Sequence, residues 1–211
     1  SKIESGKMDI VTVEYEPMSM INDISTIIST RIDNDNVEFV LDINPDIPRL
    51  LYGDNIRIKQ VIINLANNAA KFTKSGQVIL KFDYEQTSDD HIDLLFSVKD
   101  TGIGIKPKEL PRIFDRFYQG GNSRRMHIDG TGIGLNLCKM IIDMHHGTIE
   151  AGSRPDGQRG SVFTLTLPLG NAHFSSEEIE KPEEQQSTSK IKQQSAKYRV
   201  LIVDDDLEIS R

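Results

Sequence analysis

The sequence has little of several residue types, and each shortage excludes a class of protein. A single cysteine, Cys138, cannot form an internal disulfide, which favours a reducing, cytoplasmic setting. No apolar run approaches the roughly 20 residues that a membrane helix needs, and no signal peptide opens the chain. We therefore expect no membrane contact by this segment, and any anchor of a larger parent protein in the inner (cytoplasmic) membrane would lie outside it.

Basic residues are also in the minority. The 25 Lys and Arg are outnumbered by 32 Asp and Glu, which gives a formal net charge of −7. No stretch concentrates Lys and Arg, and this argues against nonspecific binding of nucleic acid.

Hydrophobic residues make up 37% of the 211 positions, enough for the core of one substantial domain. Alternating patterns predict strands and 3.6-residue patterns predict helices. Antiparallel strands with helices on one face indicate an α+β fold, a two-layer α/β sandwich with a mixed, mostly antiparallel sheet. We expect strands over 8–17, 37–43, 77–86, 91–100, 148–153 and 161–168, and helices over 18–31, 55–73, 109–114 and 133–145.

Composition changes near both ends of the chain. Residues 1–7 are polar, and residues 170–196 are rich in Ser, Glu, Gln and Lys, as in a flexible linker. Residues 198–206 (YRVLIVDDD) then read as a buried parallel strand that ends in three aspartates. We expect the main domain to span 8–169, with the linker over 170–196 and the beginning of another domain over 197–211.

One face of the predicted helix 55–73 combines amides with a cation. Asn64, Asn68 and Lys71 have i, i+4, i+7 spacing and therefore share a face beside the apolar stripe. An amide oxygen can ligate Mg²⁺ without adding charge, and a lysine can bind phosphate. A solvated polar face is the alternative, but asparagine is a poor helix former, and Asn67 adds a third.

Two glycine-bearing stretches point to a nucleotide. The first, DTGIGI (100–105), directly follows a predicted strand, where Asp100 could accept a hydrogen bond from an exocyclic amine. The second, DGTGIGL (129–135), begins a helix, and glycines before a helix N-terminus can hold phosphate. Each alone could be a tight turn, and neither matches a P-loop or lies in a βαβ unit.

The order of these motifs resembles a known family. NLANNAAKFT (64–73), DTGIGI, IFDRFYQ (113–119), DGTGIGL and GSVFTLTLP (160–168) resemble the asparagine, first glycine, phenylalanine and second glycine boxes and the closing strand of histidine kinases. The resemblance covers about residues 8–168. It implies the catalytic ATP-binding domain of a two-component sensor histidine kinase, with the Bergerat (GHKL) fold shared with gyrase, MutL and a heat-shock chaperone.

The resemblance also implies roles for single residues. Asn68 would hold Mg²⁺, Asn64 would lie beside the phosphates, and Lys71 would contact phosphate, so that Asn64 and Lys71 are the expected catalytic residues. Asp100 would bind the adenine amino group. The full expected set of ATP-binding residues is Asn64, Asn68, Lys71, Asp100, Gly102, Gly104, Ile105, Phe117, Gly130, Thr131, Gly132, Gly134, Leu135 and Thr164.

A mobile lid is implied between the phenylalanine box and the second glycine box. Phe114 and Phe117 would pack its start, and it would run over Gln119–Gly130. Arg116, Arg124 and Arg125 could reach the γ-phosphate, although loop arginines are more often solvated. Phe72 stands where many relatives have Tyr, so a hydroxyl contact is absent there.

Two other features have ordinary interpretations. His145 and His146 precede Gly147 at a helix end, where cations favour the dipole, and no carboxylate or cysteine is spaced to complete a metal site. Cys138 lies on the core side of its predicted helix and reads as a packed thiol.

The ends of the chain resemble parts of other domains. Residues 1–7 resemble the end of a dimerisation and histidine-phosphotransfer helix, and 197–211 the first strand of a response-regulator receiver. These resemblances imply a hybrid kinase, a homodimer, that transfers phosphate from ATP to a histidine and then to a receiver aspartate. An ATPase of the same fold and a pure nucleotide-binding module are the alternatives.

Overall fold

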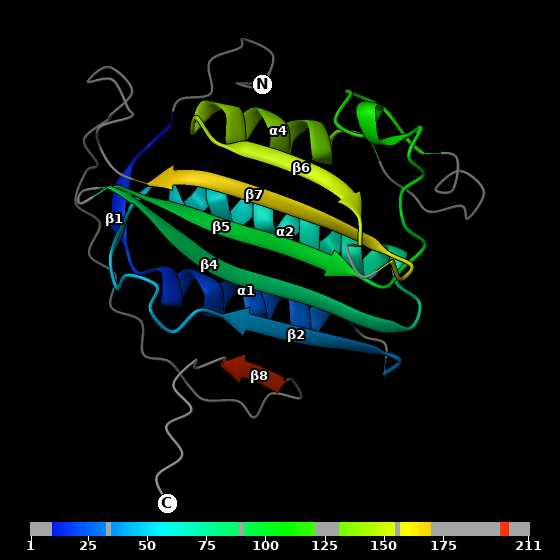
Figure 1. Cartoon of the computed structure of the whole chain (residues 1–211), viewed down its shortest axis with the longest axis horizontal. Coiled ribbons are helices and arrows are strands. Elements are labelled where there is room, and N and C mark those ends of the chain that lie inside the picture. The colour runs from blue at the N-terminus through cyan, green and yellow to red at the C-terminus, as the bar shows by residue number, and fades with distance from the viewer. Residues whose placement is uncertain are drawn as a thin grey trace, which may run out of the picture.

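A computed structural model describes residues 10–32, 35–88, 91–120, 131–154, 157–169 and 199–202. Its main layer is a six-stranded sheet of order β6-β7-β5-β4-β2-β8 (Figure 1). β2 pairs in parallel with β4 and β8, and the other pairs are antiparallel, which confirms the predicted mixed sheet. The strands are β2 (Val37–Ile43), β4 (Gly76–Ser88), β5 (His91–Asp100), β6 (Thr148–Ser153), β7 (Ser161–Leu169) and β8 (Arg199–Ile202).

Helices cover one face of this sheet, as the sequence predicts. α2 (Asn55–Phe72) packs between α1 (Pro17–Arg31) and α4 (Gly134–Met144). Figure 1 views the sheet from its other side, with α1 and α2 behind the strands. Within the described ranges, no helix is long and apolar enough to span a membrane.

The core lies between α2 and the sheet. Phe82 of β4 and Phe96 of β5 are neighbours in the antiparallel register, and their ring centroids are 4.8 Å apart. Ile58, Ile62 and Leu65 of α2 are fully buried against this layer. Each of these side chains stabilises the fold by about 1.5–3 kcal/mol, so α2 is firmly anchored where it presents its polar face.

The short elements differ from the prediction. Of the strand expected over 8–17, the described residues from 10 onward form only β1 (Val13–Tyr15), which pairs with β3 (Leu51–Gly53) in a separate two-stranded sheet. β3 was not predicted, because three residues are too few to show an alternating pattern. The helix expected over 109–114 is a 3₁₀ turn, η1 (Leu110–Arg112).

Strand β8 lies at the edge of the sheet, parallel to β2, with Val40 opposite Arg199. Of the strand predicted over 198–206, the described residues comprise only Arg199–Ile202. The predicted linker over 170–196 and the three aspartates lie outside the described residues.

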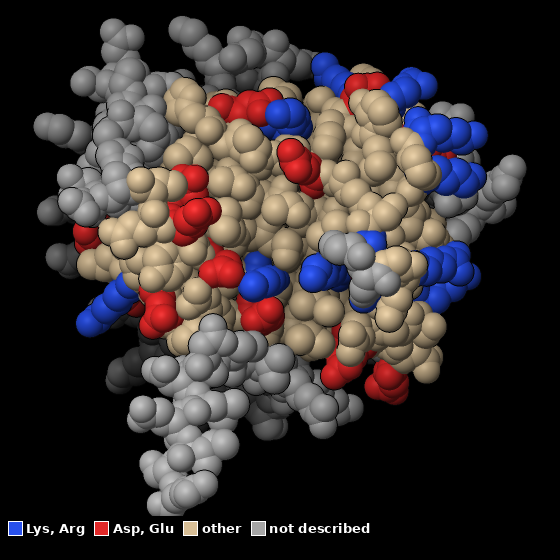
Figure 2. Space-filling model, viewed as in Figure 1, with Lys and Arg blue, Asp and Glu red and all other residues tan. Residues whose placement is uncertain are grey.

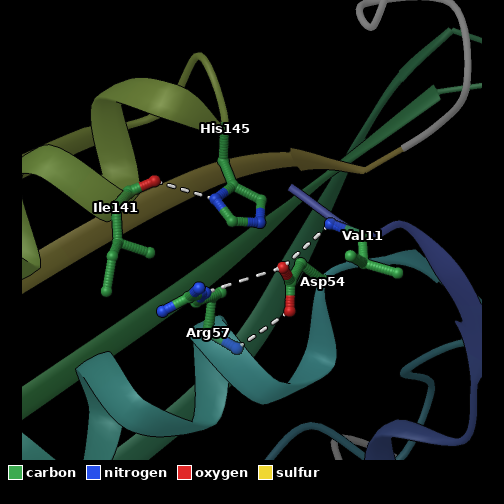
Figure 3. Close-up of polar contacts among 5 residues, drawn as sticks. All are labelled: Val11, Asp54, Arg57, Ile141 and His145. Carbon is green, nitrogen blue, oxygen red and sulfur yellow. Dashed lines mark hydrogen bonds and ion pairs between the residues drawn. The ribbon is translucent and has the colours of Figure 1, made fainter. Parts of the chain in front are cut away.

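The beginning of α2 is tied to the segment before β1. Asp54 is the N-cap of α2, and its Oδ1 accepts the Arg57 N–H at 3.0 Å. The Val11 N–H donates to Asp54 Oδ2 at 3.1 Å, and Arg57 Nε lies 4.0 Å from the same oxygen (Figure 3). Asp54 is buried, so its carboxylate satisfies donors from both segments where water is excluded.

Candidate nucleotide-binding site

A cavity of about 300 Å³ opens between α2, the loop after β5, the start of α4 and the start of β7. This volume is at the lower end of the range for small-molecule sites. Most of the residues predicted to bind nucleotide line it together, although they come from distant parts of the chain. They are Asn64, Asn68, Lys71, Asp100, Gly104, Ile105, Thr131, Gly132, Gly134 and Leu135.

Asp100, at the end of β5, is held by hydrogen bonds to both of its oxygens. Oδ1 accepts the N–H of Gly102 at 2.8 Å and that of Ser161 at 3.4 Å, and Oδ2 accepts the Ser161 hydroxyl at 2.5 Å. The residue is 3% exposed. Because a carboxylate offers about four acceptor positions, one more donor from a ligand can still be accommodated.

Gly102 lies behind the cavity rather than in its lining, which corrects the expectation that it makes room for a ring. A Cβ at this position would lie 2.3 Å from the backbone oxygen of Phe72. Only glycine therefore allows the loop after β5 to approach the end of α2 this closely. Its role here is to bring Asp100 and the polar face of α2 into one site.

The polar face of α2 lies on the same cavity. Asn64, Asn68 and Lys71 all line it, as their helical spacing predicts. Asn64 is fixed from behind, because its Nδ2 donates to the sulfur of Cys138 on α4 at 3.1 Å.

The start of α4 closes another side of the cavity. Gly132 has φ +67°, and a Cβ there would lie 2.8 Å from the Phe117 backbone, so a larger residue would be strained. Thr131, Gly134 and Leu135 complete this wall. The first N–H groups of an α-helix have no partner within the helix, so a helix start at this wall suits the phosphate interpretation.

Two predicted site residues lie away from the cavity. Phe117 has φ +64° and is 60% exposed, with Arg116 stacked 4.8 Å from its ring centroid. Its N–H donates to the Gly132 oxygen at 2.9 Å, and the left-handed backbone directs the ring outward. Tyr118 lines the cavity in its place.

Thr164 is exposed on the helix-free face of the sheet. Its neighbours Phe163 and Leu165 are buried, since successive strand residues face opposite sides. Phe163 and Ser161 line the cavity, and Thr164 is therefore excluded from the candidate site.

The expected lid can be followed only at its start. Phe114, expected to pack the start of the lid, packs edge-on against Phe163, with ring centroids 6.5 Å apart. Gly130, Arg124 and Arg125 lie outside the described residues, as does the lid from 121 to 130. Arg116 stacks on Phe117 and does not line the cavity.

Several lining residues were missed by the sequence analysis. Ser161 holds Asp100, and Phe163 supplies an apolar wall. Glu109 is nearly buried and also lines the cavity, where a Cβ on Gly120 would lie 3.3 Å from its Oε2. The alternation of the predicted strand 161–168 could have identified Ser161 and Phe163, but nothing in the sequence marks Glu109.

Of the three residues given ordinary interpretations, Cys138 and His145 are buried and His146 is exposed. Cys138 is 2% exposed, which confirms the packed thiol. His145 is completely buried, and its Nδ1 lies 2.8 Å from the Ile141 oxygen. Burial lowers the pKa of His145 and so disfavours its charged form, which argues against the dipole interpretation for this residue.

The charge distribution suits an anionic ligand despite the net charge of −7. Figure 2 shows Lys and Arg side chains gathered on the side of the molecule at which β5 ends, where Asp100 lies. A local positive potential at this end would attract polyphosphate.

Comparison with known proteins identifies a family and several relatives. Residues 53–171 match the family model "Histidine kinase-, DNA gyrase B-, and HSP90-like ATPase". The chain is 37% identical over 174 residues to the sensor histidine kinase RcsC of Escherichia coli K12, covering 82% of this chain and 18% of RcsC. It is 36% identical over 172 residues to hybrid signal transduction histidine kinase B of Dictyostelium discoideum, covering 81% of this chain and 8% of that protein.

Solved structures share the fold. The catalytic domain of the histidine kinase ThkA aligns with a TM-score of 0.58 and 26% identity, covering 74% of this chain and 97% of that domain. Full-length ShkA, solved in complex with AMPPNP, aligns with a TM-score of 0.63 and 24% identity, covering 77% of this chain and 32% of ShkA.

Proposed function

The chain belongs to the histidine kinase-, DNA gyrase B-, and HSP90-like ATPase family, and on this premise we propose that it binds Mg-ATP and transfers the γ-phosphate to a histidine of a dimerisation domain. The observation that carries the proposal is a single cavity. This cavity is lined by the fixed carboxylate of Asp100, by the face of α2 that carries two asparagines and a lysine, and by the glycine-rich start of α4.

Asp100 recognises the base. Its carboxylate is fixed by Ser161 and Gly102, so it can accept an N–H from the 6-amino group of adenine without reorienting. Ile105 and Phe163 provide apolar surface for the ring. A guanine, which has an oxygen at this position, would meet a second acceptor and be disfavoured.

The phosphates lie toward α2 and the start of α4. The residues fit Mg²⁺, because Asn68 would hold it through a neutral amide oxygen while phosphate oxygens supply the charge. Bound Mg²⁺ would neutralise charge on the phosphates. Lys71 adds a positive charge, and the N-terminal N–H groups of α4 orient the chain of phosphates. These residues would catalyse the transfer chiefly by positioning the phosphates of ATP.

The residues at the site favour transfer of the γ-phosphate to a protein over hydrolysis of ATP. ATP-hydrolysing relatives of this fold typically have a glutamate at the position of Asn64, where it orients water. An amide is no general base, and the Nδ2 of Asn64 is already bonded to Cys138.

The chain spans 8–18% of the length of the two curated relatives compared above, so the rest of the proposal concerns a larger protein. In that protein, residues 1–7 would be the end of a dimerisation helix, and residues 8–169 would be the ATP-binding domain. Residues 170–196 would connect this domain to a receiver domain that begins at 197–211. An aspartate of the receiver would then accept the phosphate from the histidine. The parent protein is a homodimeric hybrid kinase anchored in the inner membrane, with this domain in the cytoplasm.

Isothermal calorimetry with a nonhydrolysable ATP analogue tests the site. The 211-residue chain should bind it more tightly with Mg²⁺ than without, and Asp100→Ala should abolish binding. Glu150→Ala, exposed on β6, is the matched control and should bind like wild type. Unchanged affinity in Asp100→Ala would remove the adenine assignment.

A further inference from the structure

Cys138 lies behind the nucleotide cavity rather than in its lining. It is in the second turn of α4, and its sulfur contacts two groups on α2. Sγ is 3.1 Å from Nδ2 of Asn64 and 3.8 Å from the backbone oxygen of Val61. Because Asn64 lines the cavity, the thiol connects the interior of α4 to a side chain that faces the nucleotide.

The hydrogen of the thiol decides how the amide of Asn64 is turned. Burial raises the pKa of Cys138 to about 11, so the group is a neutral thiol at physiological pH. Its one hydrogen is donated to the Val61 oxygen. The sulfur can then only accept, so the NH₂ of Asn64 faces it and the amide oxygen cannot.

The oxygen of Asn64 consequently lies at the start of α4. Oδ1 is 2.7 Å and Nδ2 is 3.0 Å from the place where a Cβ on Gly134 would lie, so the oxygen is the nearer of the two to Gly134, which lines the cavity. We propose that Cys138 is a positioning residue, which fixes the Asn64 amide so that its oxygen is presented at the phosphate end of the cavity. The consequence for ATP rests on the function proposed above.

The alternative is that the Cys138 thiol only fills space in the core and does not orient the Asn64 amide. Two substitutions of Cys138 distinguish packing from hydrogen bonding. Cys138→Ser keeps one donor and an acceptor, whereas Cys138→Val fills the space and keeps neither. Ile142→Val is the control, because it removes one buried methylene from the same helix without touching Asn64.

The first measurement needs no ligand. In a ¹H–¹⁵N spectrum, the side-chain NH₂ of Asn64 is assigned by its loss in Asn64→Asp. Its hydrogen exchange should be slow in wild type, Cys138→Ser and Ile142→Val, and fast in Cys138→Val. Fast exchange in wild type would overturn the proposal, even if Cys138→Val failed to fold.

The second measurement is the gain in affinity for AMPPNP that Mg²⁺ provides. Loss of one hydrogen bond should lower this gain about fivefold in Cys138→Val. Cys138→Ser and Ile142→Val should keep it, although Ile142→Val loses stability. An unchanged gain in Cys138→Val, or an equal loss in Cys138→Ser, would show that the sulfur only packs. If wild type binds no nucleotide, the proposed function fails, and the exchange of the Asn64 amide still decides the role of Cys138.

Discussion

At the scale of single residues, the geometry around Gly134 makes a prediction that separates function from stability. A Cβ at Gly134 would press on the Asn64 amide, with 2.7 Å to Oδ1 and 3.0 Å to Nδ2. The end of a side chain can move aside at little cost, and alanine is a better helix former than glycine. Gly134→Ala should therefore keep or raise the melting temperature while weakening Mg-dependent nucleotide binding about tenfold.

Gly152 provides the matched control for this prediction. It lies on β6, and a Cβ there would meet nothing within 4 Å. Gly152→Ala should bind nucleotide like wild type in the same calorimetric titration. If Gly134→Ala did the same, the amide of Asn64 would not need its present position.

The burial of His145 leads us to expect that the stability of the fold depends on pH. Figure 3 shows its ring above the start of α2, where Asp54 favours the charged form, and Arg57 and exposed His146 oppose it. Burial is the largest effect and lowers the pKa of His145 below its usual value of about 6.5. The unfolded chain then binds a proton that the folded chain does not. The stability that His145 contributes should therefore be fully present above about pH 6.5, the unfolded value, and be lost as the pH falls from there toward the folded pKa.

Urea unfolding between pH 5 and pH 8 measures this effect. His145→Gln should flatten the loss of stability on the acidic side relative to wild type. His146→Asn is the control, because position 146 is exposed and has φ +57°, which asparagine tolerates. Wild-type pH dependence in His145→Gln would contradict the assignment.

The types of residue at the site could be predicted from the sequence better than the directions in which their side chains point. Asn64, Asn68 and Lys71 share a face because helical spacing alone fixes it. Thr164 was misplaced because its direction depends on which side of β7 faces the helices. The orientation of Phe117 depends on a left-handed backbone and a hydrogen bond to Gly132, which a single motif does not specify.

At the scale of elements, the N-terminus of α2 depends on one buried carboxylate. Asp54 caps the helix and also accepts the Val11 N–H, and it is 4% exposed. Asp54→Ala should lower the free energy of unfolding by about 2 kcal/mol, because both donors lose their partner.

Asp23→Ala is the comparison for Asp54→Ala in urea titrations. Asp23 forms a surface ion pair with Lys59 of α2 at 3.0 Å, with its side chain 58% exposed. Its removal should cost about 0.5 kcal/mol or less. Equal losses of unfolding free energy in the two variants would mean that the buried Asp54 cap stabilises the fold no more than a surface ion pair does.

Long elements were predictable and short ones were not. The 18 residues of α2 and the pairing partners β4 and β5 show clear periodic patterns. β1 and β3 have three residues each and exist only because they pair with each other. Their formation depends on tertiary contacts such as the bond from Val11 to Asp54, which local sequence does not encode.

At the scale of the whole molecule, the proposed reaction needs a second domain. The described cavity supplies groups for ATP, but no histidine is among its described lining residues. His145, at the other end of α4, is buried, and its Nδ1 lies 2.8 Å from the Ile141 oxygen, so it is unsuited to accept phosphate. Incubation with γ-labelled ATP should therefore leave the chain essentially unlabelled. Adding a histidine-containing dimerisation domain as a separate chain should give acid-labile, base-stable label on that domain, at a rate limited by weak encounter. Asp100→Ala should prevent this transfer, and Glu150→Ala should not. Rapid labelling of the chain alone on histidine would place the acceptor within it.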